Sequence, residues 1–404
     1  MANMTEHEID RIYRLSNEKI AEVSMERKRY CYDSIHWQDR LISIKGPRGV
    51  GKTTLLLQKI AESGGERRDT LYVSLDSIWL EPKDVYELAE HHVQHGGRRL
   101  VLDEVHYMQD WSRLIKNLYD DFKTLSIAYT GSSMLKLRAK DGDLSRRQSE
   151  HVIPGLSFRE FLDFEGVLSH APLTLDEILN NHVDIVEDIR TMVRILPLWE
   201  WYFRRGYYPF YLEGESQYEN RIRLAVNQTL DVDWPSVEEI TAPTIRRARK
   251  MMRILADMPP QTPKMKALYA ELETERQHGL KMLYALERAR LLTLLPSEHE
   301  SLDDLRSPEK IYLDNPNMMY ALVADANVGT ARECFFANQV GESHLLAYPK
   351  RGDFLVDDTY LFEVGGKGKT FDQIKDVPNS YVVNDGVEFT RGNKIPLWLF
   401  GFLY

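Results

Sequence analysis

The stretch Gly46-Pro47-Arg48-Gly49-Val50-Gly51-Lys52-Thr53 constrains the fold of this chain more than any other feature. It fits the pattern G-x-x-x-x-G-K-[ST], in which glycines let the backbone curl until successive N–H groups point at a phosphate. Residues 41–44 before it form a short apolar run typical of a buried parallel strand, and residues 54–61 after it have the apolar spacing of a helix. A strand, a phosphate-binding loop and a helix in this order predict an α/β fold with the phosphates at the helix N-terminus.

The side chains of this loop have distinct expected roles. Lys52 can reach the β- and γ-phosphate oxygens of a nucleotide, and the Thr53 hydroxyl can ligate Mg²⁺. The predicted nucleotide-binding residues here are Gly46, Pro47, Arg48, Gly49, Val50, Gly51, Lys52, Thr53 and Thr54.

A second apolar strand, residues 100–104, ends in Asp103 and Glu104. Downstream of a phosphate-binding loop, an aspartate at a strand's carboxyl end is expected to hold Mg²⁺, directly or through water. Glu104 is expected to accept a proton from, or orient, the water that attacks the γ-phosphate. Together the two segments predict an Mg²⁺-dependent ATPase.

Further strands at residues 71–76 and 125–130 alternate with helical segments, which predicts a parallel sheet with its ligand at the carboxyl edge. The last of these strands ends at Thr130, with Ser132 just beyond it. Either hydroxyl is a candidate sensor of the γ-phosphate, and an ordinary helix N-cap by Ser132 or Ser133 is the alternative.

Length and composition limit the number of domains, the type of partner and the location that can be expected. A chain of 404 residues predicts two or three domains, and the formal net charge of −10 gives no general bias towards nucleic acid. The polar first ten residues and the lack of a long apolar run predict neither a signal peptide nor a membrane span. With Cys31 and Cys334 far apart as reduced thiols, the expected location is the cytoplasm.

The order of motifs resembles a large family of bacterial and archaeal AAA-type ATPases. The matching segments are residues 46–53, residues 102–106 with Trp111, residues 130–133, residues 156–162, residues 206–209 and residues 310–314. The resemblance covers nearly the whole chain and implies an AAA-type P-loop parallel sheet, a helical and winged-helix region, and a smaller α/β domain like a restriction endonuclease. It also implies ATP rather than GTP, because no guanine-reading N-K-x-D element follows the loop.

The expected domains are the P-loop domain with amphipathic N-terminal helices at residues 1–164, the helical region at 165–244, the winged-helix-like region at 245–325 and the nuclease-like domain at 326–404. Ahead of the loop, the basic cluster Arg27-Lys28-Arg29 is a candidate anion contact, and a solvated helix end is the favoured interpretation.

An arginine that the family places before residues 157–161 falls on Arg147 here, with Arg146 in place of the usual glycine. A guanidinium group suits the charge of a γ-phosphate. Three alternatives stay open: action within its own subunit, action on a neighbouring subunit, and an ordinary basic surface loop.

Helices at 246–257, 264–274 and 278–292, followed by a ribbon closing at 311–313, are similar to a winged helix. DNA contact through this region is one hypothesis, although interleaved glutamates weaken it, and a structural or interaction module is the other. Its basic candidates are Arg246, Arg247, Arg249, Lys250, Lys281, Arg288 and Arg290.

The last segment has the layout of a nuclease metal site, with Asp353, Glu363 and an additional carboxylate at Glu333. Gly365 stands where such a site has a lysine, so Lys367 or Lys369 would have to reach back. This departure predicts a degenerate, non-cleaving domain. The apolar segment 396–404 is expected to be a buried strand, or an interface if exposed.

Two hypotheses remain for the use of ATP. One is a nucleic-acid-linked machine or switch that contacts duplex DNA through the winged-helix-like region. The other is a nucleotide-gated protein-interaction switch that self-associates or binds a protein partner.

Overall fold

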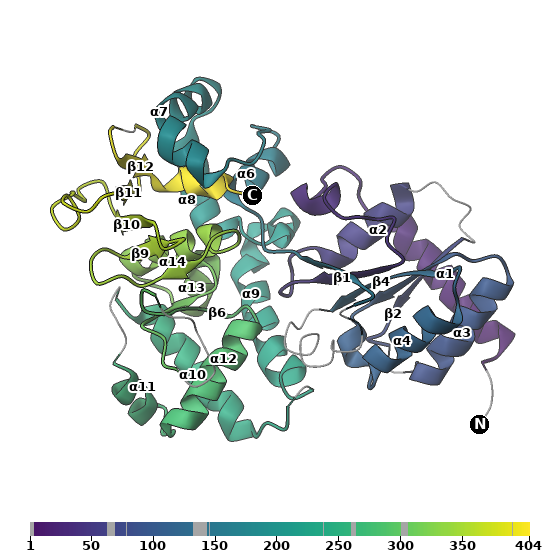
Figure 1. The fold of residues 1–404 in the computed structure, drawn as a ribbon. Helices are drawn as coiled ribbons and strands as arrows, with labels where there is room; N and C mark the ends of the chain where they lie inside the picture. The colour runs from purple at the N-terminus through teal and green to yellow at the C-terminus, as the bar shows by residue number, and fades with distance from the viewer. Residues whose placement is uncertain are drawn as a thin grey trace. The chain divides into compact units, whose positions relative to one another are not determined.

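The computed structural model describes residues 4–62, 69–77, 79–131, 144, 146–236, 238–259, 264–299, 306–389 and 391–404. The chain divides into two compact units (Figure 1). The first unit comprises Met1–Pro154 and Asp231–Glu239, and the second comprises Gly155–Leu230 and Ile240–Tyr404. The expected segments 165–244, 245–325 and 326–404 therefore lie in one unit, except for residues 231–239. Among the described helices, none combines the length and the apolar character of a membrane span.

The described residues of the first unit form a five-stranded parallel sheet in the order β2-β3-β4-β1-β5. This confirms the α/β fold with a P-loop sheet. The strands are β1 (Leu41–Lys45), β2 (Thr70–Ser74), β3 (Arg99–Asp103), β4 (Ser126–Gly131) and β5 (Ser149–Val152).

Helices cover both faces of this sheet, which explains why its central strands are apolar without alternation. Side chains at alternate positions of a strand enter opposite cores. Leu100 and Leu102 pack with the helices α3 and α4, whereas Val101 packs with α2. The helices of this unit are α1 (Glu6–Glu22), α2 (Lys52–Glu62), α3 (Pro82–Gln94) and α4 (Trp111–Asp121).

The second unit begins with helices built around an aromatic core. Trp199 and Tyr202 are buried and pack against Phe158 and Phe335, so these rings belong to the core of the second unit. The helices are α6 (Phe158–Phe164), α7 (Leu175–Met192), α8 (Ile195–Arg205) and α9 (Tyr218–Gln228). A π-helical turn, Thr229–Asp233, follows α9, and its residues from Asp231 onward belong to the first unit.

The three helices and the ribbon expected next are present in the described residues. They are α10 (Ala242–Asp257), α11 (Met265–Glu271), α12 (Arg276–Arg288) and the antiparallel strands β6 (Leu292–Leu295) and β7 (Lys310–Leu313). The helices α13 (Pro316–Leu322) and α14 (Val328–Val340) lead into the last sheet.

That sheet has the order β12-β11-β10-β9-β8 among the described residues and mixes parallel and antiparallel pairs. Its strands are β8 (Leu346–Ala347), β9 (Phe354–Val356), β10 (Tyr360–Gly365), β11 (Ser380–Asn384) and β12 (Lys394–Pro396).

The prediction of a strand over residues 396–404 is wrong in type and right in burial. Residues Leu397–Phe402 form a buried 3₁₀ helix after β12. The segment is apolar at nearly every position, so its pattern cannot separate a buried strand from a buried helix. The helix is held by aromatic packing, with the Phe400 ring 4.9 Å from Phe336 and 5.7 Å from Phe362.

Candidate nucleotide-binding site

The loop expected to bind phosphate lies between the end of β1 and the start of α2, so it opens at the carboxyl edge of the sheet. Gly49 and Gly51 have φ values of 83° and 90°, which favour glycine. At Gly46 a Cβ atom would lie 2.3 Å from the carbonyl oxygen of Ile153. Val50 is buried, and Thr54 is exposed on α2. The glycines of the motif are therefore required by backbone geometry.

Lys52 turns back into the loop. Its ammonium donates to the carbonyl oxygens of Gly46 at 3.0 Å and Pro47 at 2.8 Å. Burial lowers the pKa of Lys52, while the nearby charges of Glu104 and Asp103 oppose that shift. The ammonium is thus held at the centre of the loop, where phosphate oxygens of a nucleotide would offer it charged acceptors.

Asp103, the last residue of β3, is buried and accepts three hydroxyl hydrogen bonds. Thr53 donates from 2.8 Å, Tyr72 from 2.7 Å, and Thr130 at the tip of β4 completes the set. Burial, and then the charge of Glu104, raise the pKa of Asp103, and the hydroxyl groups act in the opposite direction. Thr53 and Asp103 present adjacent oxygen ligands of the kind that Mg²⁺ prefers, so these residues fit a nucleotide-bound Mg²⁺.

Glu104 follows in a left-handed conformation, with φ 56° and ψ 44°. Its backbone N–H donates to the Thr130 hydroxyl at 3.0 Å. Thr130 therefore contacts both acidic residues of the strand end. The other hydroxyl candidate, Ser132, lies outside the described residues.

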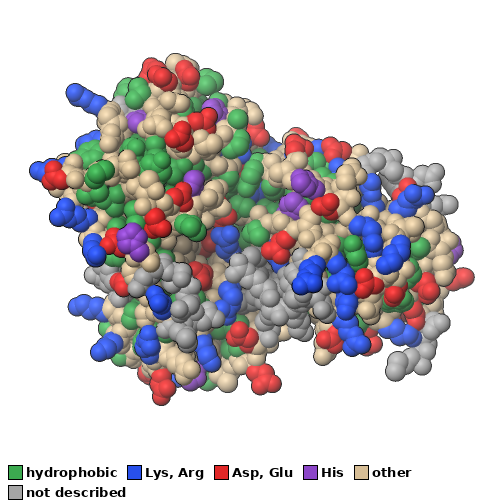
Figure 2. All heavy atoms as spheres, in the orientation of Figure 1, with side chains coloured by type: hydrophobic (Ala, Val, Ile, Leu, Met, Phe, Trp, Pro, Cys, Tyr) green, Lys and Arg blue, Asp and Glu red, His purple; other side chains and the backbone are tan. Residues whose placement is uncertain are grey.

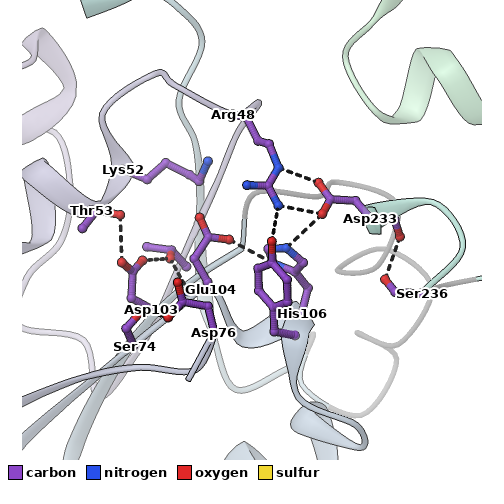
Figure 3. Close-up of polar contacts among 12 residues, drawn as sticks. Arg48, Lys52, Thr53, Ser74, Asp76, Asp103, Glu104, His106, Asp233 and Ser236 are labelled. Carbon is purple, nitrogen blue, oxygen red and sulfur yellow. Dashed lines mark hydrogen bonds and ion pairs between the residues drawn. The ribbon is translucent and has the colours of Figure 1, made fainter. Parts of the chain in front are cut away.

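A residue that sequence reasoning missed completes the site. Asp233 accepts two hydrogen bonds from Arg48, from Nε at 2.9 Å and from Nη2 at 2.7 Å (Figure 3). Its Oδ1 also lies 3.3 Å from Nε2 of His106, whose Nδ1 is 3.2 Å from Oε2 of Glu104. Burial alone would raise the pKa of Asp233, yet the bonds from His106 and Arg48 outweigh it and the pKa is lowered.

Arg29 was interpreted as part of a solvated helix end, and it is buried instead. Its guanidinium donates to the backbone carbonyls of Val50 and, at 2.9 Å, of Pro154. It therefore joins the phosphate-binding loop to the segment that follows β5. Basic residues next to each other in sequence gave no signal that one of them would turn inward.

Arg147 lies elsewhere. It precedes β5, whose first residue Ser149 pairs with Ile42 near the start of β1, whereas the loop follows the opposite end of β1. Its side chain pairs with Asp120 at 3.4 Å. Arg147 is thus at the amino edge of the sheet and not at the loop of its own unit. Action on a neighbouring copy stays a prediction.

The carboxylates of the expected nuclease-like site do come together in the second unit, but lysines lie among them. Lys310 of β7 is 2.6 Å from Glu333 and 3.6 Å from Asp353. Lys369 reaches back and pairs with Glu363, as one of the two lysines was expected to do. Burial and the charge of Asp353 raise the pKa of both glutamates. Within the described ranges, no three His, Cys, Asp or Glu side chains are grouped to hold a metal ion.

Several basic residues expected to face DNA are engaged inside the second unit. Arg247 donates to the carbonyl oxygen of Leu272 at 3.0 Å, and Lys250 donates to that of Glu271 at 2.6 Å. Arg290 forms an ion pair with Glu342 at 2.7 Å. On the face drawn in Figure 2, basic and acidic side chains are interspersed.

Comparisons with known proteins bear on the first unit most directly. Residues 38–162 match the family model described as an AAA domain. The chain is 29% identical over 398 residues to the uncharacterized protein MJ1637 of Methanocaldococcus jannaschii, an alignment that covers 88% of this chain and 83% of that protein. It is 26% identical over 166 residues to an uncharacterized protein of Haemophilus influenzae, covering 38% of this chain and 41% of that one.

Similar solved structures include AMPPCP-bound DnaA from Aquifex aeolicus and a chain from a study of katanin self-assembly. The first is 12% identical with a TM-score of 0.26 and covers 70% of this chain and 77% of that one. The second is 18% identical with a TM-score of 0.29 and covers 44% of this chain and 70% of that one.

Proposed function

We propose that this AAA-type P-loop domain binds ATP with Mg²⁺ and hydrolyses it. The observation that carries the proposal is the convergence of three separate segments at one sheet edge. Lys52 and Thr53 come from the loop and α2, Asp103 and Glu104 from the end of β3, and Thr130 from the tip of β4, with Thr53 and Thr130 both bonded to Asp103.

The expected division of labour follows from the chemistry of these groups. Lys52 would bind the β- and γ-phosphate oxygens, and Thr53 and Asp103 would hold Mg²⁺, which neutralises phosphate charge when bound. Glu104 would accept the proton of the attacking water. Its carboxylate is 20% exposed, so water can reach it, while its backbone is fixed through Thr130.

The test is steady-state ATP hydrolysis together with the binding of a fluorescent ATP analogue. Glu104→Gln should bind the analogue normally and lose turnover at least about 100-fold, the usual scale for a general base. Lys52→Ala should weaken binding itself. Glu90→Gln, an exposed carboxylate on α3, serves as the matched control. Equal hydrolysis by wild type and Glu104→Gln would show that the base is misassigned.

For the use of ATP, we infer a nucleotide-gated protein-interaction switch over a machine that acts on DNA. The net charge of −10 and the internal engagement of Arg247, Lys250 and Arg290 support it. X-ray scattering with and without ATP should show compaction or self-association. Binding of duplex DNA with steep salt dependence and a change in ATP turnover would instead support the nucleic-acid hypothesis. That hypothesis is motivated by the helices α10, α11 and α12 and the ribbon of β6 and β7.

A further inference from the structure

We propose that Asp233 is a positioning residue for ATP hydrolysis, which fixes Arg48 of the phosphate-binding loop and, through His106, aligns Glu104 with the attacking water. The inference rests on the proposed function. It adds a residue that lies 185 positions after Arg48 and outside every motif that identifies the site.

The contact between Asp233 and Arg48 is a bidentate ion pair with little solvent exposure. Both carboxylate oxygens of Asp233 accept from the guanidinium, at 2.9 and 2.7 Å, and the side chain of Asp233 is fully buried. Paired N–H···O bonds of this kind set orientation as well as contributing energy. Tyr107 adds a third bond, accepting from Nη2 of Arg48 at 2.8 Å. The side chain of Arg48 is thereby held in one orientation on the loop.

The contact with His106 links Asp233 to the expected base. The imidazole lies between two carboxylates, with Nε2 facing Asp233 and Nδ1 facing Glu104. Its side chain is 1% exposed, so water does not compete for either nitrogen. A neutral ring can donate to one of the two carboxylates and an imidazolium to both. As an imidazolium the ring donates to both carboxylates, so Asp233 fixes the plane of the ring and the ring in turn fixes the carboxylate of Glu104.

The backbone of Glu104 needs such support. A glutamate in the left-handed region is strained, and this conformation persists where the surroundings hold it. Thr130 holds the main chain, and His106 lies against the side chain. One contact to the main chain and one to the side chain set where the carboxylate of Glu104 lies.

The local structure around Asp233 is built for a fixed position. Asp233 ends the π-helical turn Thr229–Asp233, a form of helix that often marks functional sites. The Ser236 hydroxyl then donates to the carbonyl oxygen of Asp233 at 2.6 Å. The segment Asp231–Glu239 belongs to the first unit although the chain before and after it belongs to the second. Asp233 is thus brought to the site by a segment that is remote from the phosphate-binding loop in sequence but belongs to the same unit.

The experiment compares Asp233→Asn with wild type in the full-length protein, measuring kcat, KM and the Kd of a fluorescent ATP analogue. Misplacing a catalytic group by about 1 Å costs up to about 100-fold in rate, so we expect kcat to fall roughly 10- to 100-fold with Kd changed less than about threefold. The control Glu239→Gln removes one exposed carboxylate from the same segment and should match wild type. His106→Gln interrupts the same series of contacts, from Asp233 through His106 to Glu104, and should reproduce the loss of kcat.

A double-mutant cycle separates positioning from general damage. In single-turnover assays, Asp233→Asn should add little to Glu104→Gln, because the residue acts through that carboxylate. Unchanged or increased kcat in Asp233→Asn would overturn the inference, as would an equal rise in Kd or full additivity with Glu104→Gln. Should Asp233→Asn not fold, unchanged kcat in His106→Gln would overturn it equally. If wild type binds no ATP, the proposed function fails first and this inference falls with it.

Discussion

Lys310 offers a direct measure of how the second unit tolerates two buried carboxylates, Glu333 and Glu363, beside the partly exposed Asp353. Its side chain is 5% exposed and forms ion pairs with Glu333 and Asp353, while Glu363 depends on Lys369. Lys310→Met keeps a similar side-chain volume and removes the charge. Removing one partner of a buried pair typically costs about 3–5 kcal/mol because the other charge is left uncompensated.

The loss should depend on pH. Without Lys310 the pKa of Glu333, already raised by burial, rises further, so the variant keeps a proton there that its unfolded chain releases. A folded-state pKa raised in this way gives stability at low pH that is lost as the pH rises. We therefore expect a loss of about 3–5 kcal/mol at pH 8 and a clearly smaller one at pH 5.

The assay is urea denaturation followed by circular dichroism, with hydrogen exchange of α14 to assign the transition to the second unit. The control is Lys350→Met, whose side chain is 89% exposed in a surface pair with Glu298 and should cost no more than about 1 kcal/mol. Lys310→Met combined with Glu333→Gln should recover much of the loss. Equal stability of the Lys310 and Lys350 variants, or a loss independent of pH, would refute the reasoning.

Three further predictions concern both units. Gly46→Ala should weaken nucleotide binding at least about tenfold, since its Cβ atom would lie 2.3 Å from the carbonyl oxygen of Ile153. The control in the same binding assay is Gly368→Ala, whose Cβ atom would have no neighbouring atom within 4 Å. Arg29→Gln should raise KM for ATP and lower the melting temperature, because two carbonyls that brace the loop lose a charged donor. Burial raises the pKa of Asp314 to about 6, so between pH 4 and 6 the unfolded chain releases this proton before the folded chain does. The free energy of unfolding should therefore fall by up to about 3 kcal/mol as the pH rises through this range. Denaturation curves should show wild type losing stability relative to Asp314→Asn over the same range.

The sequence was sufficient for the parts of the site that follow from local pattern. Lys52 and Asp103 were predictable because buried parallel strands show as apolar runs, and the ends of such strands meet at one sheet edge. Thr130 was predictable for the same reason, since β4 lies beside β3. The edge strand β5 was not, because its residues Ser149–Val152 are largely polar and carry no apolar run.

The residues that were missed depend on contacts distant in sequence. Asp233 lies in a π-helical turn 185 positions after Arg48 of the loop in sequence, and an isolated aspartate carries no signal of its partner. Arg29 has the same chemistry whether solvated or buried, and its placement follows from backbone carbonyls that no pattern marks. Arg147 shows the converse, because a plausible chemical role did not determine on which edge of the sheet the residue lies.

The return of Asp231–Glu239 to the first unit has a consequence for how such chains can recombine. An exchange of residues 38–162 between two relatives would carry Arg48 and His106 but leave Asp233 behind in the recipient. The grafted loop would then face whatever residue the recipient has at that position. The site is therefore transferred whole only with the longer stretch that ends after residue 239. Substitutions at positions 48, 106 and 233 should constrain one another across that stretch.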